Sequence, residues 1–135
     1  MRAALLLLGA LFVAGCGSTG GPAARIVLDA SHHDRIIRAE QGQLIELRLA
    51  SAAPVGHDAA TAGPRWDIDR LDGPTIVAEA APRFEPAGPA AGSQGTTVFV
   101  FRAAQPGRAM IRLVYRYPWQ QAVKGDTFLA WIHVR

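Results

Sequence analysis

Apolar and polar residues alternate along several short runs of this chain. In one of them Ile45, Leu47 and Leu49 share a face, and Glu46 and Arg48 lie on the other. This period of two residues is typical of a β-strand that buries one side. The runs that we interpret as strands are 25–28, 36–40, 44–49, 65–71, 75–77, 96–101, 109–117 and 127–134.

These runs are separated by turn signals and show no helical period, which predicts one fold class. Seven to eight short strands of this kind favour an all-β, antiparallel β-sandwich. Three connections stand out by their content of small residues, glycine and proline: 50–64, 86–95 and 118–126. Alternate loops of a sandwich gather at one end, so we expect these three to lie side by side.

The three tryptophans have different expected roles. The run 109–117 stops at Pro118, which lacks an N–H for the ladder, and this places Trp119 just past the strand end. A rigid aromatic side chain there is typical of a binding anchor. The alternative is that it folds back over the end of the sandwich. Trp66 and Trp131 lie within strands, where we expect core packing.

The first residues indicate export. Arg2 precedes the apolar run 3–14, which is too short to span a bilayer and ends in small residues, as a secretory signal does. The end of the run, Val13-Ala14-Gly15-Cys16, resembles the bacterial lipoprotein box, in which cleavage occurs just before the cysteine. The alternative is an ordinary signal peptide with an incidental cysteine.

The lipoprotein box implies a membrane anchor and a division of the chain. Several acyl chains on Cys16 exceed the one-chain limit of marginal attachment. We therefore expect residues 1–15 to be a lipoprotein signal peptide, 16–24 a lipidated cysteine with a flexible tether, and 25–135 one domain. Gly17, rather than Asp, favours an outer membrane facing the periplasm or surface over the inner membrane.

Composition excludes some classes of function. Cys16 is the sole cysteine, so the chain cannot form an internal disulfide. The formal charge is +3, and it becomes +2 without residues 1–15, where Arg2 is the one charged residue. The basic residues alternate with apolar ones along the strands instead of clustering, which argues for solvated faces and against binding of nucleic acid.

Catalytic and metal-binding patterns are missing from the sequence. The histidines at 32, 33, 57 and 133 have no strong ligand spacing, and adjacent histidines in a strand point to opposite faces. Asp67 and Asp69 share a strand face, but Arg65 and Arg70 flank them, as in an ordinary solvated surface. We expect no enzyme activity, no metal and no cofactor.

Three motifs together resemble one family. Thr61-Ala62-Gly63-Pro64-Arg65-Trp66 is followed by the Gly-rich Gly92-Ser93-Gln94-Gly95, which leads into Thr96-Thr97-Val98-Phe99, and then by Tyr115-Arg116-Tyr117-Pro118-Trp119. The combination resembles the chagasin family, small immunoglobulin-like inhibitors of papain-type cysteine proteases found in protozoa and bacteria. The likeness covers roughly residues 25–135. Where the family has Asn-Pro-Thr-Thr, this chain has Ala59-Ala60-Thr61-Ala62, and position 117 is Tyr instead of Arg.

The resemblance implies an immunoglobulin-like β-sandwich and a reversible, non-covalent inhibitor. Three adjacent loops would occlude the cleft of a papain-like cysteine peptidase, and Gly63, Gly92 and Gly95 would permit close backbone approach or positive φ. We expect a monomer whose partners are the cell's own, host or foreign peptidases. The alternative is a membrane-tethered adhesion or assembly module without inhibitory activity. The implied protease-binding residues are Thr61, Ala62, Gly63, Trp66, Gly92, Ser93, Gln94, Gly95, Arg116, Tyr117, Pro118 and Trp119.

Overall fold

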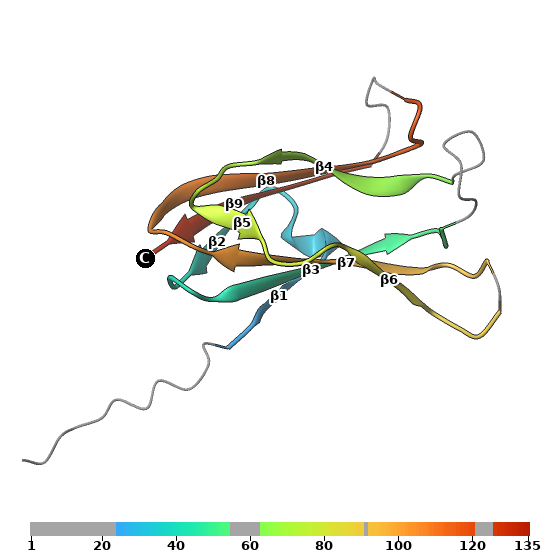
Figure 1. Ribbon diagram of the computed structural model, residues 1–135, viewed down its shortest axis with the longest axis horizontal. Helices are drawn as coiled ribbons and strands as arrows, with labels where there is room; N and C mark the ends of the chain where they lie inside the picture. The colour runs from blue at the N-terminus through green and yellow to red at the C-terminus, as the bar shows by residue number, and fades with distance from the viewer. Residues whose placement is uncertain (1–23, 55–62, 91, 121–125) are drawn as a thin grey trace, which may run out of the picture.

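Two facing β-sheets build the domain (Figure 1). The computed structural model describes residues 24–54, 63–90, 92–120 and 126–135. One sheet has the order β1-β3-β7-β5, with β6 also pairing with β7, and the other has the order β2-β9-β8-β4. The strands are β1 (Ile26–Leu28), β2 (Arg35–Ala39), β3 (Leu44–Ser51), β4 (Arg65–Leu71), β5 (Ile76–Ala78), β6 (Arg83–Pro86), β7 (Gly95–Ala103), β8 (Gly107–Arg116) and β9 (Thr127–Val134). One turn of 3-10 helix, η1 (Ala30–His32), joins β1 to β2.

The core lies between the sheets and follows the alternation of the sequence. In β3, Ile45 and Leu47 are fully buried, and Leu49 is nearly so. In β9 the inward positions begin at Phe128 and continue at every second residue. The same cluster contains Phe99 and Phe101 of β7, whose rings stack with their centroids 6.2 Å apart. The all-β sandwich expected from the pattern is therefore confirmed.

The strand count and pairing differ from the expectation. The described residues contain nine strands, not seven to eight, because the Pro-containing segment Arg83–Pro86 pairs with β7. The sheets are mixed, since β1 runs parallel to β3 and β2 runs parallel to β9. These edge strands have three and five residues. In so short an apolar run the sequence does not indicate whether the strand pairs in a parallel or an antiparallel direction.

One strand departs from alternation, and one side-chain assignment was wrong. Strict alternation would place Trp66, Ile68 and Arg70 on one side of β4, but a register shift between Ile68 and Arg70 changes the phase, so that Leu71 packs against the core. Trp131 is not a core residue: it is 41% exposed on the outer face of its sheet. Its inward-facing neighbours Ala130 and Ile132 fill the core, which leaves the odd position outside.

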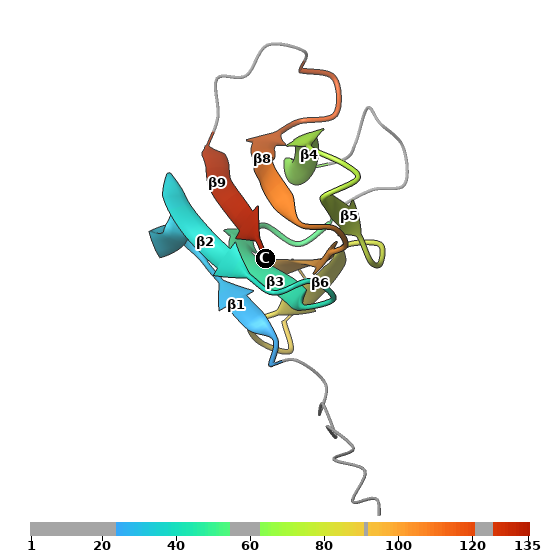
Figure 2. The same cartoon turned by 90° about the vertical axis from the view of Figure 1, so that its left-hand side faces the viewer.

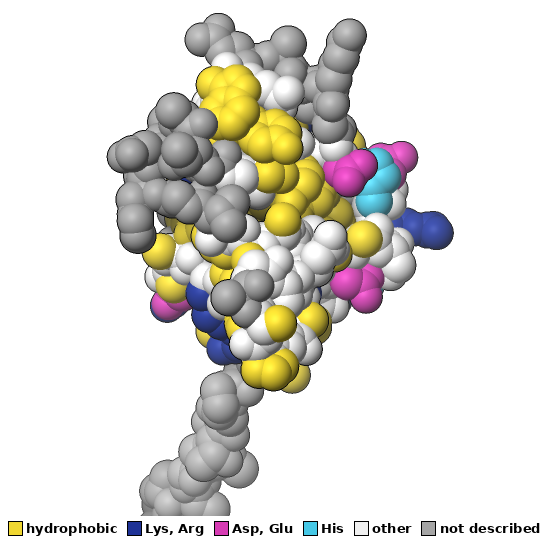
Figure 3. Space-filling model, turned by 90° about the vertical axis from the view of Figure 1, so that its right-hand side faces the viewer, with side chains coloured by type: hydrophobic (Ala, Val, Ile, Leu, Met, Phe, Trp, Pro, Cys, Tyr) yellow, Lys and Arg dark blue, Asp and Glu magenta, His cyan; other side chains and the backbone are white. Residues whose placement is uncertain are grey.

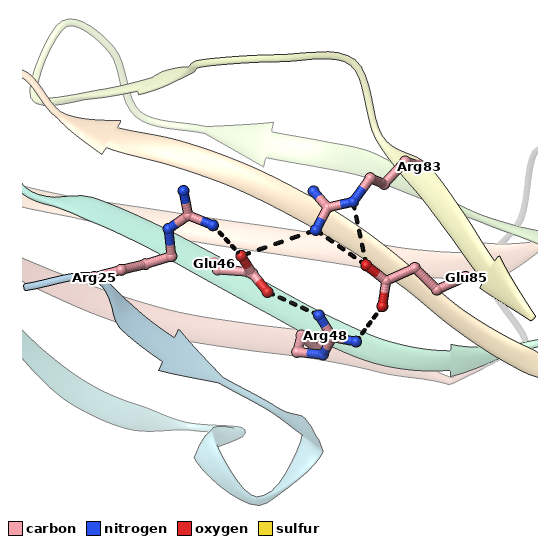
Figure 4. A network of polar contacts seen from close by, with 5 residues as sticks. All are labelled: Arg25, Glu46, Arg48, Arg83 and Glu85. Carbon is pink, nitrogen blue, oxygen red and sulfur yellow. Dashed lines mark hydrogen bonds and ion pairs between the residues drawn. The ribbon is translucent and has the colours of Figure 1, made fainter. Parts of the chain in front are cut away.

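A polar network covers the outer face of the β1-β3-β7 sheet (Figure 4). Glu46 of β3 is buried and accepts hydrogen bonds from Arg25 at 2.5 Å and from Arg48 at 2.8 Å. Arg48 also pairs with Glu85 of β6, and Arg83 pairs with Glu85 at 3.1 Å. The network therefore joins the segment before β1 to the central strand β3 and to β6.

The molecule has two distinct ends. Strands β3, β6 and β8 finish at one end of the sandwich, where β4, β7 and β9 begin (Figure 1). β1 begins and β9 finishes at the other end (Figure 2). The turn that precedes β3 holds them together there, since the Gln43 side chain donates to Ala24 O and Gln41 N–H donates to Arg135 O. Within the part of the chain that the structure describes, no helix is long and apolar enough to cross a membrane.

Candidate functional site

Strand register brings the ends of three connections together. Within one sheet, Gly95 at the start of β7 lies beside both Ser51 at the end of β3 and Pro86 at the end of β6. Within the other, Arg65 at the start of β4 lies beside Arg116 at the end of β8. The connections 52–64, 87–94 and 117–126 therefore leave the sandwich at the same end, as the composition predicted. We call this surface the loop end.

Tyr115 and Trp66 tie the two sheets together beneath the loop end. The hydroxyl oxygen of Tyr115 accepts a hydrogen bond from Ala52 N–H at 2.9 Å, and Trp66 Nε1 donates to Ala50 O at 2.9 Å. The two rings pack with centroids 5.2 Å apart. Both bonds hold the end of β3, the N-terminal stem of the first connection, to the opposite sheet. Sequence reasoning missed the role of Tyr115, although its place at an inward strand end was readable.

The third connection begins with a closed turn that exposes two aromatic rings. Gln120 N–H donates to Tyr117 O at 3.0 Å, and Tyr117 N–H donates to Gln120 Oε1 at 3.2 Å. Trp119 is 55% exposed and stacks on Tyr117, itself 39% exposed, with ring centroids 4.9 Å apart and planes 24° apart. Apolar side chains gather on this face of the molecule (Figure 3). The turn presents Trp119 outward instead of folding it over the sandwich.

The second connection is held by its own hydrogen bonds. Ala87 N–H donates to Gln94 O at 3.0 Å, and the Ser93 hydroxyl donates to Gly88 O at 3.3 Å. Gly92 has φ of +76°, so the expected positive φ is present at this glycine. Gly95 is needed for a different reason, because β6 passes directly over its Cα. A Cβ there would lie 2.7 Å from Phe84 Cζ and 2.9 Å from Pro86 Cα.

The first connection is described only at its two stems. Thr61 and Ala62 lie outside the described residues. Gly63 is half-buried and, with Ser51, Pro54, Trp66 and Phe84, lines a hollow of about 240 Å³ between the stems and β6.

Arg116 does not reach toward the connections. Its guanidinium pairs with Asp67 on the outer face of the sheet at 3.3 Å, so the structure gives this predicted contact residue an intramolecular partner.

Polar clusters near the loop end serve the fold. Asp29 caps η1: the Ser31 hydroxyl donates to Asp29 Oδ1 at 2.5 Å, and His32 Nδ1 lies 3.0 Å from the same oxygen. The bond from the Ser31 hydroxyl, first among several, lowers the pKa of Asp29. The side chains of Asp29, Ser31 and His32 together form the capping box and the first turn of η1, which accounts for their hydrogen bonds. The described ranges contain no group of three His, Cys, Asp or Glu side chains able to hold a metal ion.

Comparisons with known proteins agree with this architecture. The family described as Chagasin family peptidase inhibitor I42 matches residues 38–130. No curated protein matches the sequence. The solution structure of Amebosin is 25% identical, with a TM-score of 0.60, covering 83% of this chain and 99% of that one.

Two further solved structures share the fold. The cysteine protease inhibitor EhICP2 from Entamoeba histolytica is 16% identical, with a TM-score of 0.63, covering 85% of this chain and 100% of that one. PbICP-C, solved in complex with falcipain-2, is 15% identical, with a TM-score of 0.51, covering 83% and 90%.

Because the family match spans most of the folded part, this chain belongs to the chagasin family of peptidase inhibitors. Its fold is the immunoglobulin-like sandwich of these neighbours. Members of the family are protease inhibitors and not enzymes, which confirms the expectation that the chain has no catalytic activity.

Proposed function

We propose that the chain is a reversible, non-covalent inhibitor of papain-family cysteine peptidases that fills the active-site cleft with the loop end. The observation that carries the proposal is the convergence of three connections at one end of a rigid sandwich, with Trp119 exposed on a closed turn. Family membership supports peptidase inhibition, and the solved complex of PbICP-C with falcipain-2 supports a cysteine peptidase as the target.

Occlusion needs a preformed surface more than it needs chemistry. The stems are fixed by Tyr115, Trp66 and strand pairing, so the loop end loses little conformational entropy when it enters a cleft. An aromatic anchor that becomes fully desolvated in a pocket contributes ~2 kcal/mol or more. In this proposal Trp119 and Tyr117 form one edge of the wedge, Gly92 to Gly95 the other, and Thr61 to Gly63 lie over the catalytic thiol.

The experiment that tests this function is a titration of papain and of a cathepsin with the purified chain, with peptide hydrolysis as the readout. The expected result is competitive inhibition of peptide hydrolysis, with the inhibitor recovered uncleaved. No inhibition at micromolar concentration of the chain overturns the proposal. That result would favour the alternative, an adhesion or assembly module with the same sandwich fold. The observation that supports this alternative is the replacement of the family's Asn-Pro-Thr-Thr by Ala59-Ala60-Thr61-Ala62.

We further propose that the inhibitor is a bacterial lipoprotein held at a membrane by acyl chains on Cys16. The sequence Val13-Ala14-Gly15-Cys16 supports it, and residues 1–23 lie outside the described part of the chain. The first described residues support it indirectly: Ala24 lies at the end of the sandwich opposite the loop end, so an anchor reached through it leaves the wedge uncovered.

A further inference from the structure

The outer face of the four-stranded sheet carries an exposed apolar pair. Trp131 of β9 is the direct neighbour of Ile36 on β2, and its neighbour on β8 is the buried Met110. Ile36 is 61% exposed and Trp131 is 41% exposed. With Asp72, Arg108, Ala109 and His133 they line a hollow of about 490 Å³. The Asp72 carboxylate there already accepts hydrogen bonds from Arg70 and from Met110 N–H. Large apolar side chains grouped on a surface mark a place that another surface covers.

The next row on the same face is basic. His133 is the direct neighbour of both Arg38 on β2 and Arg108 on β8. Within the described residues neither arginine has a carboxylate at ion-pair distance, whereas Arg112 on the same face pairs with Asp69 at 3.4 Å. Two guanidiniums without a carboxylate partner, beside an exposed Trp, suit a ligand that presents phosphate groups next to apolar matter.

The position of this face relative to the N-terminal segment identifies the ligand. His133 lies two residues before Arg135, whose carbonyl accepts from Gln41 N–H, and Gln43 reaches Ala24 at the same end. Residues 16–24 span at most ~30 Å when fully extended. A chain anchored through Cys16 therefore keeps this face within reach of the bilayer, where even a weak contact is favoured by its high effective concentration.

We propose that this face, formed by Ile36, Arg38, Arg108, Trp131 and His133, rests against the anionic phospholipid headgroups of the membrane that anchors the chain. The inference rests on the lipid anchor proposed above. Trp favours the boundary between acyl chains and headgroups, and each arginine near an anionic surface strengthens association about fivefold. The loop end lies at the other end of the strands, so the contact leaves it open to a peptidase.

Quenching of Trp fluorescence by brominated lipid tests the proposal. The chain purified from membranes is placed in vesicles of phosphatidylethanolamine and phosphatidylglycerol with brominated acyl chains. We expect quenching that Trp131→Phe largely removes, and that falls in vesicles of phosphatidylcholine alone or at high salt. Arg38→Ala combined with Arg108→Ala should reduce it to the phosphatidylcholine level. The matched control is Arg35→Ala, an exposed arginine of the same strand on its other face, which should keep the quenching.

The proposal is overturned if the parent and Trp131→Phe chains are quenched equally, or if neither is quenched. It is also overturned if sedimentation shows that the parent chain is a dimer and Trp131→Phe a monomer, because a second copy then covers this face. Two readouts on the same samples keep the causes apart. The mass of the chain reports whether Cys16 carries lipid, and inhibition of papain reports the proposed function. If the chain carries no lipid but is still quenched, the membrane contact of this face stands and the lipid anchor does not. If the chain carries no lipid and is not quenched, both proposals are overturned.

Discussion

At the scale of single residues, Tyr115 shows how one hydroxyl positions the stem of the first connection. It is half-buried at the end of β8, and it accepts the N–H of Ala52 from the opposite sheet at 2.9 Å. Ala52 is the first residue after β3, where the sheet ladder no longer satisfies the backbone. Without that acceptor, the stem of the first connection has one fewer restraint on its direction, and its N–H needs water instead.

We therefore predict that Tyr115→Phe lowers the free energy of unfolding by about 1 kcal/mol, the usual net contribution of one hydrogen bond. Inhibition should weaken as well, because the first stem becomes less preorganised. Urea denaturation and the inhibition constant measure the two effects. Tyr117→Phe is the control for stability, since no hydrogen bond of the Tyr117 hydroxyl is present among the described residues. Equal losses in both variants would contradict the role assigned to Tyr115.

Gly95 offers a second prediction at this scale. Replacement by Ala places a Cβ 2.7 Å from Phe84 Cζ and 2.9 Å from Pro86 Cα, so β6 must move away from β7. We expect a loss of about 1–3 kcal/mol in unfolding free energy, as for other overpacked sites. Gly88→Ala is the matched control, because a Cβ there meets nothing within 4 Å. Equal melting temperatures of the two variants would show that β6 does not pack tightly against Gly95.

At the scale of elements, β6 is joined to the sheet by ion pairs as well as by its ladder with β7. Arg83 of β6 and Arg48 of β3 are both direct neighbours of Val98 on β7, and Val98 is fully buried although it lies on the outer face. The aliphatic stems of the two arginines cover it while their head groups reach Glu46 and Glu85. The network in Figure 4 therefore forms a small second layer over this sheet.

This layer predicts a pH dependence. The hydrogen bond from Arg48, followed by that from Arg25, holds the pKa of Glu46 below its ordinary value of 4.5. A carboxyl whose folded pKa is lowered adds stability above the unfolded pKa and loses it as pH falls through the folded value. Glu46→Gln should therefore melt below the parent chain at pH 7, and the gap should close below about pH 4. Circular dichroism melts from pH 7 to 2 measure it. Glu40→Gln is the control, because the exposed Glu40–Arg135 pair contributes little. If both variants lose the same melting temperature relative to the parent at pH 7, the stabilising role of the Glu46 network is contradicted.

Elements with strict alternation were predictable, and the others were not. β3, β8 and β9 bury every second residue on the core side, so this face could be read directly from the sequence, although Glu46, Met110 and Val114 on the outer side are buried as well. β6 has four residues including Pro86, and no local pattern encodes its pairing with β7 or the ion pair of Glu85 with Arg48 of β3. Trp131 was misplaced because residue type was weighed above its phase relative to Ala130 and Ile132. The register shift after Ile68 likewise arises from pairing with β8.

For the site, the motifs led to the loop end but not to its supports. Trp119 was expected at a strand exit, and the structure places it there on a turn. The hydrogen bonds of Tyr115 and Trp66 join segments 63 and 16 residues apart, so they depend on the packing of the two sheets. Arg116 looked like a loop residue, but its strand phase directs it to Asp67 on the sheet face.

At the scale of the whole molecule, Ala24, the first described residue, lies at the end of the sandwich opposite the loop end. The proposed lipidation predicts that the mature chain fractionates with membranes and is heavier than residues 16–135 alone by the mass of its acyl chains. Cys16→Ser removes the acceptor thiol, so the variant should lose both the added mass and the membrane fraction. Mass spectrometry and membrane fractionation check this, and an unmodified mature parent chain would contradict it.

The most direct measurement of the central claim is the inhibition constant of three chains against papain in one assay. Trp119 and Trp131 are both exposed tryptophans, one at the loop end and one on a sheet face. The account predicts inhibition by the parent chain, at least tenfold weaker inhibition by Trp119→Ala, for a loss of roughly 1.4 kcal/mol or more, and unchanged inhibition by Trp131→Ala. Unchanged inhibition by Trp119→Ala, or no inhibition by the parent chain, would contradict it.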